Sequence, residues 1–176
     1  MIKNIAFFSL TALVLGFSAC KKDTATQQEL ITKVIVHLQG SNGFNQEFAW
    51  SDPDGGDISN AVVDDIIIPT GTTDITCHIH VLDESKSPTE DLTSEIEGEG
   101  DVHLLVYKIS GTAVSMIDYN DTDGNGKPLG LDTKWTAGTG TGSVNIVLHH
   151  QPVTKDDLNN PGGEIDFDVT FPVSIQ

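Results

Sequence analysis

The chain has 176 residues, of which 26 are Asp or Glu and only 9 are Lys or Arg, so its formal net charge at pH 7 is −17. A surface of that sign repels nucleic acid, and no arginine is present to grip a phosphate group with two hydrogen bonds. Composition and charge therefore exclude nucleic-acid binding and argue against a nucleotide ligand.

Residues 1–19 have the pattern of a secretion signal. Lys3 supplies a positive charge ahead of an apolar run that is too short for a stable membrane span. Ser18 and Ala19 directly precede Cys20, and small residues before a cysteine are the pattern that bacterial lipoprotein processing reads. We expect cleavage before Cys20, lipidation of Cys20, and a flexible tether over 20–29 between the lipid anchor in the membrane and the folded part.

Residues 30–176 are expected to form a single domain, because no repeat or shift in composition divides them. Apolar and polar residues alternate, β-branched residues are frequent, and turns rich in Gly, Asn, Asp and Pro separate the segments. The pattern predicts an all-β fold, an antiparallel immunoglobulin-like β-sandwich of about seven to nine strands. The predicted strands lie near 31–39, 45–51, 62–68, 73–82, 101–109, 113–119, 131–136, 143–151 and 166–175.

Two segments carry finer expectations. In the last strand, Phe167 and every second residue after it are expected to face the core, while Asp166 and its alternates face away. Pro172 in that strand predicts either a position at the edge of a sheet or an interruption of the hydrogen-bond ladder. The acidic segment 83–100 is the only stretch in which we expect a turn of helix.

The segment 121–132 matches the opening of a calcium-binding loop. Asp121, Asp123 and Asn125 occupy the first, third and fifth places, and a glycine follows at the sixth. The Lys127 carbonyl falls at the seventh place and Asp132 at the twelfth. Asp in place of Glu at the twelfth position, a proline at the eighth and flanking strands depart from the usual loop. The alternative is a hairpin loop that uses the same residues for its turns.

Two histidines two positions apart, His78 and His80, must project from one face of a strand. Two imidazoles in that arrangement can share a borderline ion such as zinc. By the same alternation we place His37, His103 and His149 on faces turned away from the core. The alternative for all five is solvated polar surface.

Catalysis is not expected. The chain contains no Gly-x-Ser-x-Gly elbow, phosphate-binding loop, His-Glu-x-x-His helix or Cys-x-x-Cys pair. Cys77 lies between Ile75 and Ile79 in a predicted strand, so we interpret it as a buried small apolar residue. A pair of carboxylates brought together only by folding is the one enzymatic alternative that the sequence leaves open.

The signal ending at Cys20 and three segments, 82–91, 121–131 and 162–171, together resemble a family of small envelope lipoproteins of Bacteroidota-type bacteria. Members of that family are often labelled as having the type 1 periplasmic binding fold. That label conflicts with the pattern here, because the named fold alternates strands with helices. The resemblance implies genes beside TonB-dependent receptors and a lipid anchor in the outer membrane, and it leaves open which face of that membrane carries the protein.

Two functional hypotheses follow. The first is a non-catalytic, lipid-anchored binding protein that is an accessory to an outer-membrane uptake receptor and is related to metal ions. The second is a structural or adhesive surface domain that calcium stabilises through the loop 121–132. Calcium at that loop and zinc at His78 and His80 are therefore the candidate cofactors.

Overall fold

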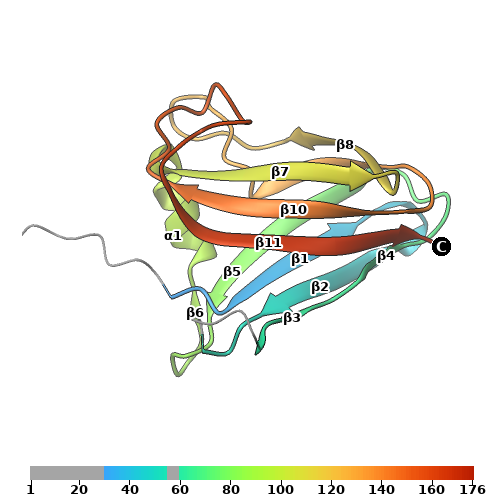
Figure 1. The fold of residues 1–176 in the computed structure, drawn as a ribbon, viewed down its shortest axis with the longest axis horizontal. Coiled ribbons are helices and arrows are strands. Elements are labelled where there is room, and N and C mark those ends of the chain that lie inside the picture. The colour runs from blue at the N-terminus through green and yellow to red at the C-terminus, as the bar shows by residue number, and fades with distance from the viewer. Residues whose placement is uncertain (1–29, 55–59) are drawn as a thin grey trace, which may run out of the picture.

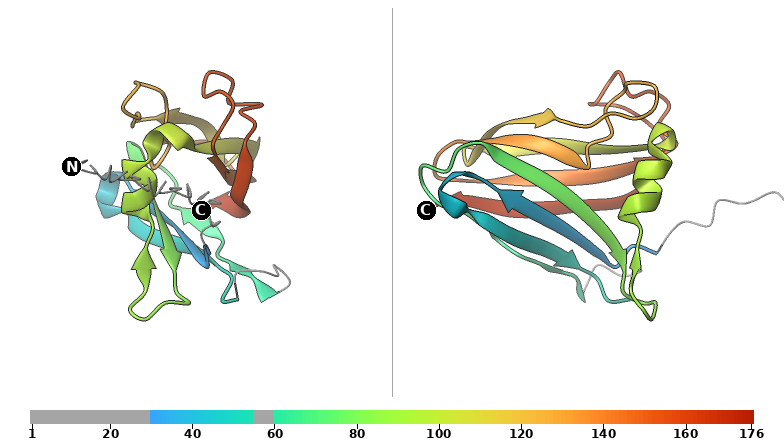
Figure 2. Two further views of the ribbon diagram at one scale, coloured as in Figure 1. Left: turned by 90° about the vertical axis from the view of Figure 1, so that its left-hand side faces the viewer. Right: turned by 180° about the vertical axis from the view of Figure 1, so that it is seen from behind.

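The protein folds as two β-sheets packed face to face (Figure 1, Figure 2), which confirms the predicted all-β sandwich. The structure is a computed structural model that describes residues 30–54 and 60–176. The predicted signal peptide, Cys20 and the tether lie outside the described residues. None of the described helices is long and apolar enough to cross a membrane.

The larger sheet has the strand order β3-β2-β1-β5-β9-β8, with β6 paired to β5. Its strands are β1 (Lys33–Gln39), β2 (Asn45–Ser51), β3 (Val62–Val63), β5 (Ile75–Asp83), β6 (Glu90–Asp91), β8 (Val114–Tyr119) and β9 (Asp132–Ala137). The smaller sheet has the order β4-β11-β10-β7. Its strands are β4 (Ile66–Ile68), β7 (His103–Gly111), β10 (Thr141–His150) and β11 (Glu164–Ile175). Within this sheet β4 and β11 run parallel, whereas the other pairs run antiparallel.

The strand predicted over 62–68 is divided between the two sheets. The backbone N–H of Asp64 donates to the carbonyl of Ala49 in β2, and the N–H of Ala49 donates to the Asp64 carboxylate. These two hydrogen bonds end β3, after which the chain crosses to the smaller sheet and forms β4. The division and the short strand β6 raise the number of described strands above the range expected from the sequence.

Alternating side chains of both sheets meet in one core. Cys77 in β5 is buried, as predicted, and burial raises the pKa of its thiol. In β11 the alternate residues from Phe167 to Val173 are buried as well. A side chain as large as Phe171, which is fully buried, contributes about 1.5–3 kcal/mol by leaving water.

Short helices lie at the two ends of the sandwich. The expected turn in the acidic segment is α1 (Thr93–Gly98), whose Ile96 is completely buried and closes one end of the core (Figure 2). A 3-10 turn, η3 (Gly100–Val102), connects α1 to β7, and a second one, η1 (Ser41–Gly43), connects β1 to β2. Pro172 lies in β11 just before β4 begins to pair at Val173, where β11 still forms the edge of its sheet.

Candidate metal centre

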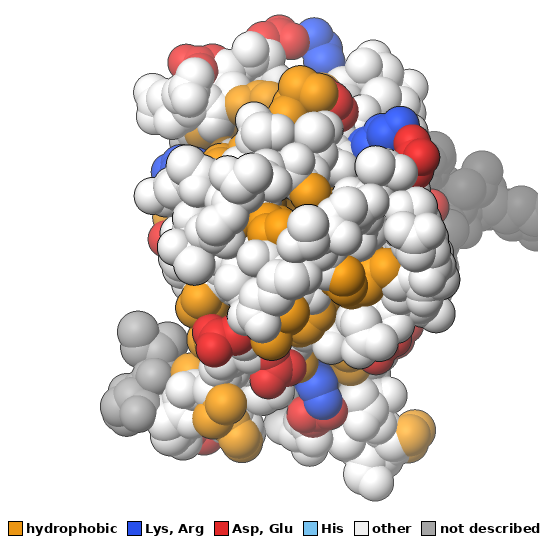
Figure 3. Space-filling model, turned by 90° about the vertical axis from the view of Figure 1, so that its right-hand side faces the viewer, with side chains coloured by type: hydrophobic (Ala, Val, Ile, Leu, Met, Phe, Trp, Pro, Cys, Tyr) orange, Lys and Arg blue, Asp and Glu red, His pale blue; other side chains and the backbone are white. Residues whose placement is uncertain are grey.

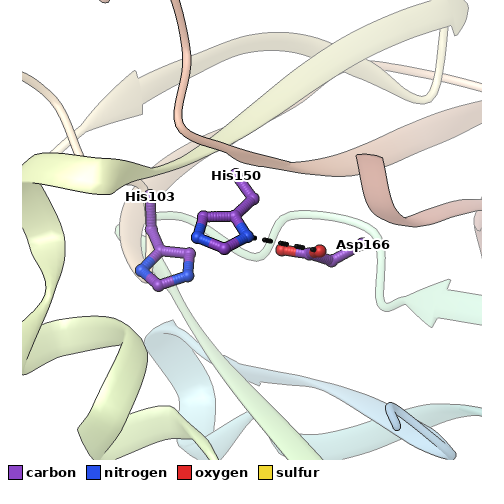
Figure 4. A group of neighbouring side chains, drawn as sticks. All are labelled: His103, His150 and Asp166. Carbon is purple, nitrogen blue, oxygen red and sulfur yellow. Dashed lines mark ion pairs between the residues drawn. The ribbon is translucent and has the colours of Figure 1, made fainter. Parts of the chain in front are cut away.

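Three neighbouring strands bring His103, His150 and Asp166 together at the end of the sandwich beside α1 (Figure 4). His103 begins β7, His150 ends β10 and pairs with it in register, and Asp166 lies near the start of β11. One ligand atom of each residue lies within 4.8 Å of the other two. Within residues 30–54 and 60–176, no other group of three His, Cys, Asp or Glu side chains converges in this way.

A β-bulge is the reason that Asp166 faces this cluster. Leu148 pairs with Phe167, but the next residue of β10, His149, pairs with Ile165, so Asp166 is an extra residue in β11. Bulges of this kind turn a side chain to a new direction. The expectation that Asp166 faces away from the core is therefore wrong, and its side chain is only 7% exposed beside His150.

The expectation for His103 is also wrong. Its side chain is buried because it projects from the same face of β7 as the core residue Leu105. The intervening Leu104 is buried too, on the other face, where the segment 158–163 covers neighbouring residues of β7 and β10. A strand that is buried on both faces has no apolar-polar alternation, so the sequence does not reveal which face is which.

A backbone carbonyl orients the His103 ring. The His103 Nδ1 atom lies 3.1 Å from the carbonyl oxygen of Glu99. Since a carbonyl oxygen only accepts hydrogen bonds, Nδ1 carries the proton, and the lone pair of Nε2 is available to a ligand. Histidines that bind metals are oriented in this way by their second nitrogen.

The spacing of the cluster is close to that of a coordination shell. The His150 Nδ1 and Asp166 Oδ1 atoms are 3.9 Å apart, which is too long for a hydrogen bond. The ring centres of His103 and His150 are 5.0 Å apart. Two atoms that bind one tetrahedral zinc ion at about 2.0–2.1 Å lie about 3.4 Å from each other. Shifts of about 1 Å in these side chains would therefore bring all three ligand atoms onto one ion.

Burial shifts the pKa of two of the three groups, His103 and Asp166. It lowers the pKa of His103, with His150 acting in the same direction, while the hydrogen bond to Glu99 opposes the change. Burial raises the pKa of Asp166, and the two histidines oppose that change. Neutral imidazole is the form that binds metal, and a bound cation would stabilise the charged form of the Asp166 carboxylate.

Two imidazoles and one carboxylate are a ligand set for borderline divalent ions such as zinc or ferrous iron. Calcium prefers six to eight oxygen atoms, so the cluster is a poor calcium site. Three protein ligands leave at least one position of the ion to water or another molecule.

The predicted calcium loop is closed by its own hydrogen bonds. The Asp121 carboxylate accepts the N–H groups of Gly130 and Asp132, at 2.7 and 2.9 Å. One oxygen of Asp123 accepts the N–H groups of Asn125 and Lys127. In the described structure, Asp121, Asp123 and Asp132 do not converge as three ligands within 4.8 Å of one another. Calcium binding by the loop remains a prediction.

The cation that contacts Asp123 is the ammonium group of Lys155. The Lys155 ammonium donates to the second oxygen of Asp123 at 2.9 Å and also to the carbonyls of Gly100 and Pro128. The side chains of Lys155 and Asp123 are only 6% and 1% exposed. This buried ion pair joins the loop 121–131, the segment that leads into His103 and the segment that follows His150.

The structure brings His78 and His80 together on the outer face of the larger sheet, with ring centres 4.8 Å apart. His37 in β1 lies beside them, and its ring centre is 6.4 Å from that of His80. Asp132, predicted at the end of the calcium loop, contacts the His78 ring.

A hollow of about 640 Å³ lies at the end of the sandwich opposite α1, where Figure 3 shows apolar side chains among polar ones. Phe44, Phe48 and Ile67 line it together with uncharged polar residues. No acidic, basic or histidine side chain is among its lining residues, so it offers no acid-base or metal chemistry.

The sequence predicted neither His150 nor Asp166 as a ligand. Only His150 had a signal in the sequence: it follows His149 at the end of a strand, and because adjacent residues of a regular strand face opposite ways, one of the two has to face the core. Comparison with known proteins gave no match to a protein-family profile, a curated protein or a solved structure. The geometry of the three residues is therefore what supports this site.

Proposed function

We propose that this protein is a non-catalytic binding protein that holds one divalent transition-metal ion at His103, His150 and Asp166. The observation that carries the proposal is the convergence of three ligand atoms from three strands within 4.8 Å, where His103 is buried and the other two side chains are only 13% and 7% exposed. Zinc or ferrous iron suits the two imidazoles and the carboxylate better than calcium does.

The cellular setting is a further part of this proposal. The signal ending at Cys20 supports a lipid anchor in the outer membrane, and the family resemblance supports a role as accessory to a TonB-dependent uptake receptor. A lipid-anchored domain that holds a metal ion beside such a receptor would retain that ion, or a complex of it, near the site of uptake. Unchanged growth of a deletion strain under metal limitation, with no receptor co-purifying, would contradict the setting while leaving the metal site standing.

The metal site is tested by titrating the full chain, carrying Cys20→Ser to prevent lipidation, with zinc after treatment with a chelator. Native mass spectrometry counts the bound ions, and isothermal titration calorimetry gives their affinities. We expect one buried-site equivalent that is lost in Asp166→Asn and in His150→Ala. Asp166→Asn keeps the shape of the side chain and removes its charge, so it leaves the packing in place.

His149→Ala is the matched control. His149 is the chain neighbour of His150, but its Nδ1 atom lies 3.0 Å from the carbonyl oxygen of Gly162, outside the cluster. We expect this variant to bind zinc as the unchanged protein does. Zinc binding that is equal in Asp166→Asn, His150→Ala and the unchanged protein would overturn the assignment.

A further inference from the structure

A second group of imidazoles lies on the outer face of the larger sheet, remote in the chain from the first. His37 in β1 and His78 in β5 are register partners on neighbouring antiparallel strands. His80 is two residues further along β5 and so projects from the same face as His78. The residues between and beside them, Cys77 and Ile79, are buried in the core. The three histidines therefore share the solvent side of the sheet.

We propose that His37, His78 and His80 form a second, solvent-exposed site that binds a borderline divalent metal ion such as copper or zinc. The ion would be held between β1 and β5, independently of the buried cluster in the other sheet.

The ring separation of His78 and His80 fits such a site, whereas His37 lies further out, so the three ligand atoms do not all converge within 4.8 Å as those of the buried cluster do. A zinc–nitrogen bond of about 2.1 Å places the centre of each bound imidazole about 3.2 Å from the ion, so two rings at a tetrahedral angle are about 5 Å apart. The rings of His78 and His80 are 4.8 Å apart and inclined by 67°. The rings of His37 and His80 are 6.4 Å apart, so His37 has to approach by about 1 Å to complete the set.

Outer partners already orient two of the three rings. The Nδ1 atom of His78 is 2.5 Å from Oδ1 of Asp132, and a carboxylate that accepts this proton leaves Nε2 of His78 as the metal-binding atom. The Nε2 atom of His37 is 2.6 Å from the amide oxygen of Asn45, which leaves Nδ1 of His37 with the lone pair. Bound histidines in metal sites show this pairing of one nitrogen with an outer acceptor.

The surrounding charges favour a cation. Glu47 in β2 is the register partner of His37, and Asp91 in β6 acts on His80 from the other side. Burial, His78 and His37 lower the pKa of His80, and the two carboxylates oppose the change.

Exposure distinguishes this site from the buried one. The side chains of His78 and Asp132 are 43% and 47% exposed, whereas His150 and Asp166 are 13% and 7% exposed. An ion on the outer face is reached directly from solvent and exchanges with it. The site therefore suits capture of an ion rather than its long retention.

The test uses the full chain carrying Cys20→Ser and Asp166→Asn, so that the buried cluster contributes nothing. Copper(II) is titrated in, and the bound equivalents, the affinity and the broadening of each histidine ring signal in NMR spectra are measured. We expect one equivalent, with the ring signals of His78 and His80 lost first and that of His103 unaffected. Adding His80→Ala should lower the affinity at least tenfold.

Two further variants make the outcome decisive. Asp132→Ala removes the outer partner of His78 and should weaken copper binding by about 10–100-fold without removing a ligand. His149→Ala removes a histidine from the other sheet and should leave binding unchanged. Circular dichroism verifies that each variant is folded. Absence of copper binding in the Asp166→Asn protein, or an affinity that His80→Ala leaves unchanged, would overturn this proposal and would not affect the buried site.

Discussion

The buried ion pair between Lys155 and Asp123 gives the sharpest test of how this fold is stabilised. In Asp123→Ala the Lys155 ammonium stays buried and keeps only the carbonyls of Gly100 and Pro128 as partners. Removing one partner of a buried pair costs about 3–5 kcal/mol. Because this pair lies beneath loops rather than in the core, we expect Asp123→Ala to lower the free energy of unfolding by about 3 kcal/mol. Urea unfolding monitored by tryptophan fluorescence measures this loss.

A double-mutant cycle identifies the cause. Lys155→Met removes the cation and keeps much of its apolar length, so Asp123→Ala combined with Lys155→Met should lose less stability than the sum of the two single changes. The coupling is expected because the double variant leaves no unpaired buried charge. Losses that add fully, or a loss below about 1 kcal/mol in Asp123→Ala, would refute the reasoning.

The pH dependence has a definite sign. Burial acts to raise the pKa of Asp123, but the hydrogen bonds from Lys127, Lys155 and Asn125 outweigh it, so the pKa in the folded state lies below the ordinary 3.8. The stabilisation is therefore fully present above about pH 4 and is lost as the pH falls through the folded-state pKa. The difference in stability between the unchanged protein and Asp123→Ala should shrink over that range.

Three other expectations concern single residues. Burial raises the pKa of Asp166, so folding disfavours its charged form. Asp166→Asn should therefore raise the thermal midpoint of the metal-free protein at pH 7, but not at pH 3, where the carboxyl group is protonated. The same variant should abolish the rise in midpoint that zinc causes in the unchanged protein. If the loop 121–132 binds calcium, calcium should raise the midpoint and Asp121→Asn should remove that rise; an unchanged midpoint would contradict the calcium hypothesis and leave the two N–H groups as the partners of Asp121. Burial raises the pKa of the Cys77 thiol, so a thiol reagent should label the native protein only at the rate of its unfolding, and labelling within the mixing time would disprove this.

The sequence predicts the fold correctly wherever one face of a strand is buried and the other is exposed to solvent. In β11 the alternation from Phe167 to Val173 identifies both the strand and its inward face. At 62–68 the pattern is ambiguous, because apolar residues lie on both sides of Asp64 and Asp65, and Asp64 ends one strand before the chain crosses to the other sheet. Hydrophobic patterning records burial and does not record which sheet a strand joins.

The buried site was not accessible for a related reason. A bulge has no reliable sequence signal, and the single extra residue at Asp166 reverses the face that alternation assigns to it. The outer histidines were partly accessible, because the spacing of His78 and His80 within one strand suffices to place them on one face. Their contact with His37 depends on strand order, which follows only from the three-dimensional structure.

The calcium-like loop and the buried metal site are connected through Lys155. Its ammonium contacts Asp123 on one side and the carbonyl of Gly100, three residues before His103, on the other. We therefore expect Asp123→Ala to weaken zinc binding at the buried cluster although Asp123 is not a ligand, because the segment that carries His103 loses its anchor. Asp118→Ala, an exposed change of the same type in β8, is the control.

The measurement is the zinc affinity by calorimetry, in buffer without urea. The temperature is one at which circular dichroism shows both variants to be fully folded. Two results together would show that the loop positions His103. The zinc affinity would fall in Asp123→Ala but not in Asp118→Ala, and NMR spectra of the His103 ring N–H would show that its hydrogen bond to Glu99 is lost. Equal affinities in both variants would mean that β7, β10 and β11 suffice to hold the three ligands. In that case the residues that look like a calcium loop would serve the stability of the fold alone.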